Sequence, residues 1–198
     1  CVPHPDFFDY CQELLVRYRH DERVALITGR CDFDIVPAGG DSYFTSAMHF
    51  CWGWASWRRV WAGYDYTLAP FTAWRYYRAL RRYFPLSGLS TVLWRMNIFF
   101  MCKRRQPRDA WDYQFCISTQ MHHQFTLVPK VNLVKNIGFD DRATHTGGFS
   151  DNRGVGTVMP LHHPAELTYD PRYDIRYSYK RQRPLSTWYC FIRNLLHI

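Results

Sequence analysis

The chain has 198 residues, a formal net charge of +8, and a composition that is 47% hydrophobic, 18% aromatic and 21% charged. This balance excludes a disordered chain, and the sequence contains no apolar run of about 18 residues that would span a membrane. The seven cysteines are scattered and form no C-x-x-C pair, which argues against a disulfide framework or zinc knuckle and suits a reducing cytoplasm. The positive charge favours anionic partners: a nucleotide diphosphate, a phosphorylated glycan or an acidic membrane face.

Helix and strand signals alternate at the start of the chain. A helix is predicted over 6–19, with Asp6 as its cap and an apolar stripe of Phe7, Cys11, Leu14, Leu15 and Tyr18. A short buried strand follows at 24–28, then a loop over 30–42 and another short strand at 43–46. Helix, tight turn and buried strand in succession are typical of an α/β protein.

Four of the eight Trp residues lie between Trp52 and Trp61. Gly53 separates two of them, which indicates a backbone held close to another segment. From Trp54 onward, the spacing of Trp54, Trp57 and Trp61 predicts one face of a helix. The periodicity favours a core position for these rings, and the alternative is a wall for a flat ligand such as a sugar ring.

The rest of the chain is predicted to be mainly helical. A basic, aromatic, amphipathic helix is expected over 71–83, with a face that is either solvated or placed on an acidic membrane. Further helices are expected over 91–103 and within Asp109 to His123, where the WDYQF block lies at the helix start, followed by a strand at 125–128 and a long loop over 129–146. The glycine-rich segment 147–157 is expected to be flexible, and a terminal helix is expected at a membrane or partner surface.

Five ordered blocks carry a resemblance to a known family: FFDYCQELL, VALITG, WGWASWRRVW, WDYQF and PKVNLVKNIGFDDRATHT. Together they resemble the second half of bacterial nucleotide-sugar glycosyltransferases of the GT-A type, in the broad family 2 group. The resemblance covers most of residues 1–165 and weakens after about Pro164. It implies an α/β chain with a partial GT-A fold, a mixed sheet flanked by helices, over 1–165, and a C-terminal extension over 166–198.

The family's acidic metal motif, Asp-x-Asp, immediately precedes the helix that matches Phe7 to Tyr18. The resemblance therefore places this motif and the nucleotide-binding half upstream of Cys1. Asp32 and Asp34 have the same spacing, but we expect them to be solvated loop acids. The chain alone is expected to be inactive, with a strand edge exposed where the upstream half would pair.

Asp112 is the candidate catalytic base. Flanking aromatic residues would desolvate its carboxylate and make it a better base for an acceptor hydroxyl. In the resembling enzymes an acidic residue at a helix start fills this role. A helix-start acid that only interacts with the helix dipole is the alternative interpretation, and Asp109 is the rival base.

The resemblance assigns the other site residues. His145 is the predicted ligand of a divalent Mn or Mg ion, which it would share with the upstream acidic motif. Lys130, Lys135 and Arg142 are predicted to contact phosphate. The floor for donor sugar and acceptor is predicted to comprise Trp52, Gly53, Trp54, Trp57, Arg58 and Trp111. The pairs His122-His123 and His162-His163 are not expected to bind metal, because adjacent side chains point apart.

The resemblance implies an inverting, metal-dependent glycosyltransferase fragment. Its partners would be a nucleotide-diphosphate sugar and a glycan or lipid-linked acceptor of the bacterial surface, and it would be cytoplasmic or peripheral at the inner face of the membrane. The alternative is a non-catalytic module that binds carbohydrate or a membrane surface. Single-stranded nucleic-acid binding by aromatics interleaved with Arg is a third, weaker hypothesis, because no nucleic-acid module is recognisable.

Overall fold

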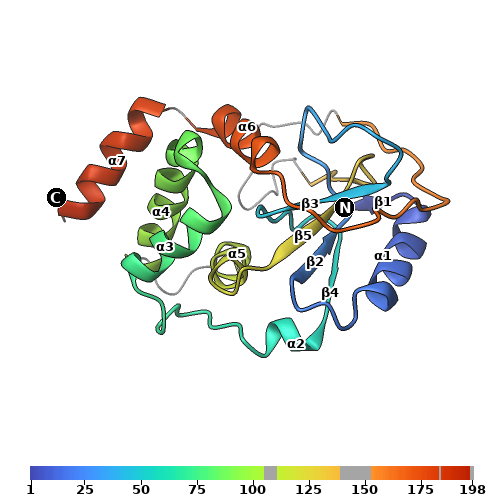
Figure 1. The fold of residues 1–198 in the computed structure, drawn as a ribbon, viewed down its shortest axis with the longest axis horizontal. Helices are drawn as coiled ribbons and strands as arrows, with labels where there is room; N and C mark the ends of the chain where they lie inside the picture. The colour runs from blue at the N-terminus through green and yellow to red at the C-terminus, as the bar shows by residue number, and fades with distance from the viewer. Residues whose placement is uncertain (105–110, 139–152, 183, 197–198) are drawn as a thin grey trace. The chain divides into compact units, whose positions relative to one another are not determined.

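The computed structural model describes the chain except for residues 105–110, 139–152, 183 and 197–198, and in the last helix the side chains of 184–186 and 195–196 are also outside the description (Figure 1). The chain forms two compact units. Unit 1 comprises Cys1–Thr45, His49–Trp57 and Thr126–Tyr169. Unit 2 comprises Ser46–Met48, Arg58–Phe125 and Asp170–Ile198. The segment that was predicted as a C-terminal extension thus contributes its helices to unit 2.

Unit 1 is built on a mixed four-stranded sheet with the order β3-β5-β2-β4 (Figure 1). Its strands are β2 (Val24–Thr28), β3 (Tyr43–Ser46), β4 (Trp54–Ser56) and β5 (Phe125–Pro129). The predicted strands at 24–28, 43–46 and 125–128 are therefore confirmed. A second, two-stranded sheet pairs β1 (Val2–Pro3) antiparallel with β6 (Val134–Lys135). Strand β6 lies inside the stretch 129–146, which was predicted to be a loop.

Helix α1 (Asp6–Arg17) packs against β2 and β4 and closes the core of unit 1. Its predicted apolar stripe is confirmed, because Phe7, Cys11, Leu14 and Tyr18 are all buried and Leu15 packs against them. Burial of such a stripe is the main reason why a helix of this length is stable in a protein. The α/β class predicted from the alternation of helix and strand signals is correct.

Asp6 does not cap α1. Pro5 occupies the N-cap position and offers no side-chain hydrogen bond, and His4 Nδ1 accepts one from the Asp6 backbone N–H (3.2 Å). The Asp6 carboxylate instead accepts hydrogen bonds from the backbone N–H groups of Val158 (3.0 Å) and Met159 (3.2 Å), and from the Thr157 hydroxyl. The Thr157 bond is the main cause that lowers the pKa of Asp6. The prediction failed because a cap is a local interaction, whereas Asp6 joins α1 to a segment about 150 residues away.

The predicted helix from Trp54 to Trp61 is also wrong. Residues Trp54–Ser56 form β4, and only Arg58–Trp61 form a short helix, α2. Antiparallel pairing with β2 sets Trp54 opposite Thr28 and Ser56 opposite Leu26, and this tertiary pairing overrides the helical spacing of the rings. None of the four Trp residues in this block is fully buried, and the core interpretation holds only in part: Trp57 packs against the unit 1 core, whereas Trp54 is exposed.

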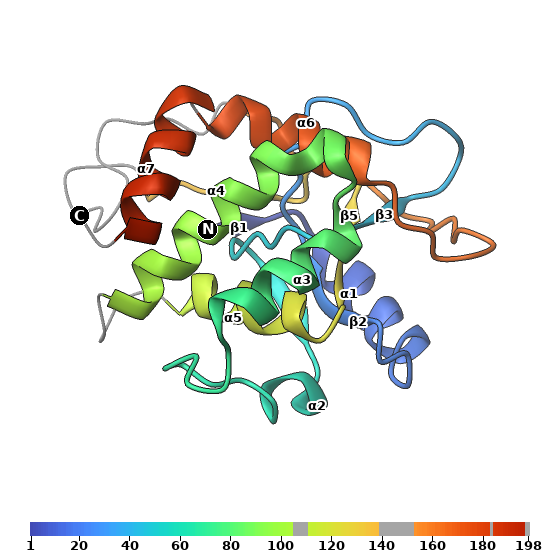
Figure 2. The same ribbon diagram turned by 60° about the vertical axis from the view of Figure 1, so that its left-hand side comes forward.

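Unit 2 is helical. It contains α2, α3 (Ala73–Tyr83), the short 3-10 helix η1 (Leu86–Gly88), α4 (Leu89–Arg104), α5 (Asp112–Met121), α6 (Pro171–Arg181) and α7 (Pro184–Leu196). Helix α4 packs against α3, α5, α6 and α7, and Figure 2 shows it running between α3 and α7. In the described part of the chain, no helix is both long and apolar enough to cross a bilayer.

Helix α6 was not predicted, although its start carries a local signal. Asp170 caps it by accepting a hydrogen bond from the Arg172 backbone N–H (3.0 Å), and Pro171 occupies the first turn. One turn further on, the buried carboxylate of Asp174 accepts hydrogen bonds from the Ser46 hydroxyl (2.6 Å) and the Ala47 N–H (2.8 Å). This carboxylate joins α6 to the end of β3.

A second buried polar group in unit 2 is the Gln120 side chain on α5. Its Oε1 accepts hydrogen bonds from the Tyr76 hydroxyl (2.5 Å) and from the Arg95 guanidinium (3.3 Å), and its Nε2 donates to the Ala47 carbonyl (2.7 Å). Arg95 is itself only 4% exposed and also donates to the Cys116 sulfur (2.9 Å). One amide therefore links α3, α4 and α5 to the segment after β3, so that these helices pack in one register.

His123, directly after α5, should make the stability of unit 2 depend on pH. Its Nε2 faces the Arg82 guanidinium, which can only donate, so the imidazole is neutral. Burial, and then the charges of Arg82 and His122, lower the pKa of His123. The unfolded chain therefore binds a proton more readily than the folded one, so the free energy of unfolding should fall as pH drops from about 7.5 to about 5.5.

The measurement is urea unfolding across this pH range, compared with His123→Asn. Asparagine tolerates the positive φ of 58° at this position and offers an amide acceptor to Arg82, but it does not titrate. We expect a shallower pH dependence in the variant. Equal slopes in the two proteins would contradict the assignment to His123.

Candidate functional site

The predicted base lies at the start of α5, within a cluster of four aromatic rings in unit 2. The Trp61 ring stacks on Phe115 with 4.5 Å between centroids, and it lies 5.5 Å from Trp111 and 5.4 Å from Tyr64. The Tyr64 hydroxyl donates to the Trp111 carbonyl (3.3 Å), which fixes the turn immediately before the helix. Phe115 is buried, whereas Trp61, Tyr64 and Trp111 are half-buried, so aromatic surface remains accessible beside the helix start.

Asp112 is the first residue of α5 and is half-buried. Its carboxylate lies close enough to Tyr64 to act on that phenol: burial, and then the charges of Tyr66, Asp112 and Asp65, raise the pKa of Tyr64 to about 12. Trp111 and Phe115, on either side of Asp112 in the sequence, belong to the aromatic cluster. The predicted aromatic surroundings of Asp112 are confirmed, and a carboxylate beside accessible rings is suited to bind a polar, ring-shaped ligand.

Gly53 has the close backbone approach that its position between two Trp residues predicts. It adopts φ of +67°, and a Cβ atom here would lie 2.5 Å from Cγ2 of Val134 in β6. Its carbonyl accepts a hydrogen bond from the Gly29 N–H (2.8 Å), and the Gly29 carbonyl accepts one from the Leu133 N–H (2.8 Å). The Trp52–Gly53 turn, the end of β2 and the segment before β6 are thus held side by side.

A buried ion pair lies at the same end of β2. Arg30 Nε donates to Asp32 Oδ1 (2.6 Å), and both side chains are almost completely buried. The Arg30 guanidinium lies over the Trp52 ring at 4.8 Å, and Arg153 also contacts the Asp32 carboxylate (3.3 Å). Asp32 is therefore not the solvated loop acid that was expected; only Asp34 is exposed, and its carboxylate lies 3.6 Å from Arg153.

The structure separates the remaining residues of the predicted sugar floor. Trp57 packs against the unit 1 core and donates its indole N–H to the Leu15 carbonyl (3.1 Å), so its ring is held by α1. Trp54 lies in β4 and is 38% exposed. Arg58 begins α2 in unit 2 and is exposed.

Of the predicted phosphate contacts, Lys130 and Lys135 are described. The ammonium group of Lys130 donates to the Gly39 carbonyl (3.2 Å), and Lys135 is exposed on β6 opposite Val2. Arg142, the predicted metal ligand His145 and the rival base Asp109 lie outside the described residues. Within the described ranges, no three His, Cys, Asp or Glu side chains gather as they would around a metal ion.

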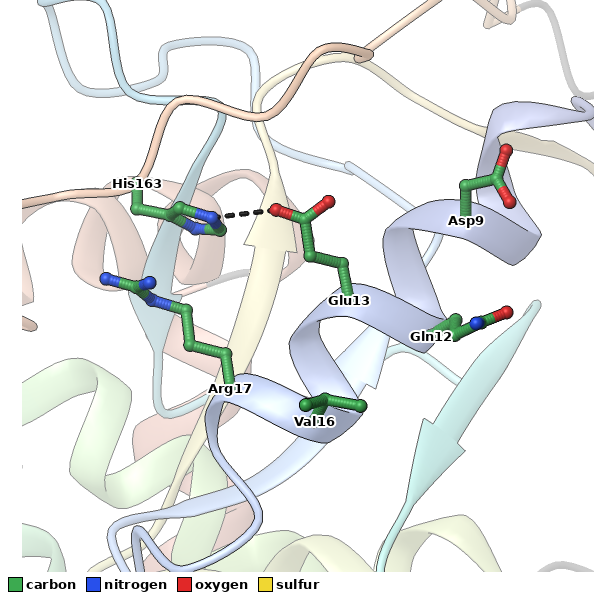
Figure 3. Close-up of a pocket in the computed structure, with 6 residues that line it drawn as sticks. All are labelled: Asp9, Gln12, Glu13, Val16, Arg17 and His163. Atoms are coloured by element: carbon green, nitrogen blue, oxygen red, sulfur yellow. Dashed lines mark hydrogen bonds and ion pairs between the residues drawn. The ribbon is translucent and has the colours of Figure 1, made fainter.

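A cavity of about 550 Å³ opens on α1 in unit 1, and none of the residues that line it was predicted as a site residue (Figure 3). It is lined by Asp9, Gln12, Glu13, Val16 and Arg17 of α1 and by His163. His163 Nε2 lies 2.8 Å from the Glu13 carboxylate, and His163 Nδ1 lies 2.8 Å from the Tyr43 hydroxyl. Tyr43 in turn lies 2.7 Å from the Tyr18 hydroxyl, so the chain of hydrogen bonds leads from the cavity into the core.

The direction of this chain follows from what each group can donate. A carboxylate only accepts, so His163 Nε2 donates to Glu13, and Nδ1 accepts from the Tyr43 hydroxyl in the tautomer that carries its proton on Nε2. Burial, followed by the Tyr18 hydrogen bond, raises the pKa of Tyr43, which keeps its phenol protonated. The arrangement therefore anchors the segment around His163 to α1 and β3 and does not supply a nucleophile.

Sequence reasoning missed two residues that organise these regions. Asn132, which served only as part of a family block, accepts from the Cys31 N–H (3.2 Å) and donates to the carbonyls of Val134 (3.1 Å) and Gly154 (3.3 Å). His163 was considered only as a metal ligand. A histidine directly after another carries no signal for the acid and phenol that it joins, since these lie more than 100 residues away.

The chain was compared with protein-family models, with curated proteins and with solved structures, and none of them matches it.

Proposed function

We propose that this chain is the acceptor-side part of a GT-A-fold glycosyltransferase. It would help to move a sugar from a nucleotide-diphosphate donor to a hydroxyl of a glycan or lipid-linked acceptor of the bacterial surface, with inversion. The observation that carries the proposal is the position of Asp112, a half-buried carboxylate at a helix start within the cluster of Trp61, Tyr64, Trp111 and Phe115. Aromatic rings stack on the apolar faces of sugars, and an adjacent carboxylate can accept the proton of the attacking hydroxyl.

The roles follow from the chemistry of the transfer. Asp112 accepts the acceptor's proton as the new glycosidic bond forms and the bond to the nucleotide diphosphate breaks, with inversion at the anomeric carbon. Trp111 holds the acceptor ring beside this carboxylate. For unit 1, the proposal gives Trp52 and Gly53, beside the buried Arg30–Asp32 pair, a part in the donor-sugar floor, and it gives Lys130 and Lys135 charge-assisted contacts to the leaving diphosphate.

A divalent Mn or Mg ion belongs to the proposal because the resembling enzymes use one. When bound, it would neutralise the leaving diphosphate. The described residues assemble no ligand set of their own, and the predicted ligand His145 lies outside them. The proposal assigns the ion's remaining ligands to the acidic motif of the resembling enzymes.

Calorimetric titration with a panel of nucleotide-diphosphate sugars, with and without Mn²⁺, tests the proposal. It should be made on this chain and on a chain extended upstream to its natural start. We expect metal-dependent binding of one donor to the extended chain and weak or no binding to the 198 residues alone. If both chains are folded and neither binds a donor, the glycosyltransferase proposal is wrong.

A calorimetric titration with glycans distinguishes the second candidate function, a carbohydrate-binding module, from glycosyl transfer. This alternative is favoured by the partial exposure of Trp54 and of the rings around Asp112. A module needs neither a base nor a metal. Glycan binding that survives EDTA and the double substitution of Asp112 and His145 would favour it.

A further inference from the structure

The outer side of α3 in unit 2 forms a surface that the proposed transfer does not use. Its inner side is buried and consists of Tyr76, Ala79, Leu80 and Tyr83. The opposite side carries Trp74, Arg75, Tyr77, Arg78 and Arg81, which we call the α3 cationic face. These positions recur at intervals of three and four residues, so their side chains cover one continuous strip of the helix.

The cations of this strip are not neutralised within the described residues. Arg75 and Arg81 each donate one N–H group to a backbone carbonyl, of Pro70 (3.1 Å) and Pro85 (3.0 Å) respectively, and neither forms an ion pair there. Arg78 has no hydrogen bond or ion pair with any described residue. The helix itself contains no Asp or Glu. Three guanidinium groups therefore have N–H donors available to an external anion.

Apolar groups accompany the charges. Trp74 is 66% exposed and its ring stacks on Tyr77, with centroids 5.8 Å apart and an interplanar angle of 20°. Leu86, in η1 just after the helix, is 78% exposed. Trp and Tyr are the side chains that settle at the boundary between headgroups and acyl chains. Leu86 lies beyond the other end of α3, next to Pro85, whose carbonyl accepts from Arg81, and an exposed leucine there gains free energy by entering an apolar phase.

The charge of the whole unit has the same sign. Unit 2 holds 17 Lys and Arg against 5 Asp and Glu, a formal charge of +12, whereas unit 1 holds 8 against 12, a formal charge of −4. The net charge of the chain is thus concentrated in one unit. An asymmetry of this kind is typical of a protein that meets a polyanion or an anionic membrane with one part of its surface.

We propose that the α3 cationic face, with Leu86, binds the surface of an anionic phospholipid bilayer. The guanidinium groups would pair with lipid phosphates, while Trp74 and Leu86 would enter the interface. A single-stranded nucleic acid is disfavoured, because the two rings of the strip are stacked on one another and Leu86 offers nothing to a base or phosphate. The proposal goes beyond glycosyl transfer and does not rest on it, since it uses none of the proposed site residues.

Co-sedimentation of the chain with vesicles tests this proposal. One set consists of phosphatidylcholine alone, and the other of phosphatidylcholine mixed with phosphatidylglycerol. We expect binding to the anionic vesicles only, weakened between about 0.1 M and about 1 M salt. Arg78→Gln should weaken this binding about fivefold, and the triple variant R75Q/R78Q/R81Q about 100-fold. Leu86→Ser should weaken it about tenfold.

The matched control is Arg17→Gln, which removes one exposed guanidinium from α1 in unit 1 and should leave vesicle binding unchanged. Equal binding to both sets of vesicles, or equal effects of Arg78→Gln and Arg17→Gln, would overturn the proposal. The proposal would also be overturned if the chain bound single-stranded DNA more tightly than anionic vesicles and Leu86→Ser did not alter that binding. This result would identify a nucleic-acid surface instead. Donor titration needs no lipid, so the two proposals fail independently. A lack of vesicle binding would leave the glycosyl-transfer proposal standing, and a lack of donor binding would leave the membrane-binding proposal standing.

Discussion

Replacing Asp112 with asparagine is expected to reduce sugar transfer about 1000-fold, because general-base catalysis commonly contributes a factor of this order. The amide has nearly the same shape as the carboxylate but cannot accept the proton of the attacking hydroxyl. Donor affinity should stay within about threefold, since the proposed role of Asp112 begins after the donor has bound. The measurement is release of nucleoside diphosphate by the extended chain with water as acceptor, together with calorimetric donor affinity.

Asp65→Asn is the matched control. Asp65 also acts on Tyr64, but its carboxylate accepts hydrogen bonds from the Thr67 N–H (2.7 Å) and hydroxyl (2.6 Å), so it serves the turn before α3. This variant should keep near-normal turnover. Asp109→Asn tests the rival base. Near-normal turnover of Asp112→Asn, or a large loss in Asp109→Asn alone, would show that Asp112 is not the base.

Gly53→Ala is expected to lower the free energy of unfolding by about 3 kcal/mol. About 1 kcal/mol or more comes from holding a non-glycine residue at φ of +67°, and the rest from the new Cβ, 2.5 Å from Val134 Cγ2, which must displace a buried side chain. Thermal or urea unfolding of the 198-residue chain provides the measurement.

Two other glycines separate these causes. A Cβ at Gly29 would lie 2.6 Å from atoms of Phe7 and Val134, but Gly29 has no positive φ, so Gly29→Ala should cost about 2 kcal/mol through crowding alone. Gly40 has no atom within 4 Å of its Cβ position and no positive φ, so Gly40→Ala should change stability by less than about 0.5 kcal/mol. Equal stability of all three variants would contradict this account of the Trp52–Gly53 turn.

Elements whose signal is local could be predicted from the sequence. Helix α1 and strand β2 were found because their apolar residues follow a clear period and a short turn separates them. The WDYQF block, which contains Asp112, was expected at a helix start, and α5 does begin at Asp112. The role of Asp112 as a base follows from the family resemblance and not from a periodic pattern.

Elements decided by distant partners could not be predicted. The spacing of Trp54, Trp57 and Trp61 fits a helix, but hydrogen bonding to β2 makes the first of them part of a strand. Asp32 was taken as a surface acid because nothing near it in sequence announces that Arg153 will also reach its carboxylate. The partner strand of Trp54 and the Arg153 side chain lie tens of residues away, beyond any periodic pattern, whereas Arg30, two residues before Asp32, was a local signal that went unused.

The hydrogen bonds from Ser46 and Ala47 to Asp174 have a consequence for the synthesis of the protein. The two groups leave the ribosome about 128 residues before the carboxylate that they need. At roughly 5–20 residues per second, the nascent chain waits roughly 6–26 seconds before this buried contact can close. During that interval the end of β3 lacks its buried acceptor, so the nascent chain is a natural client for a chaperone until α6 emerges.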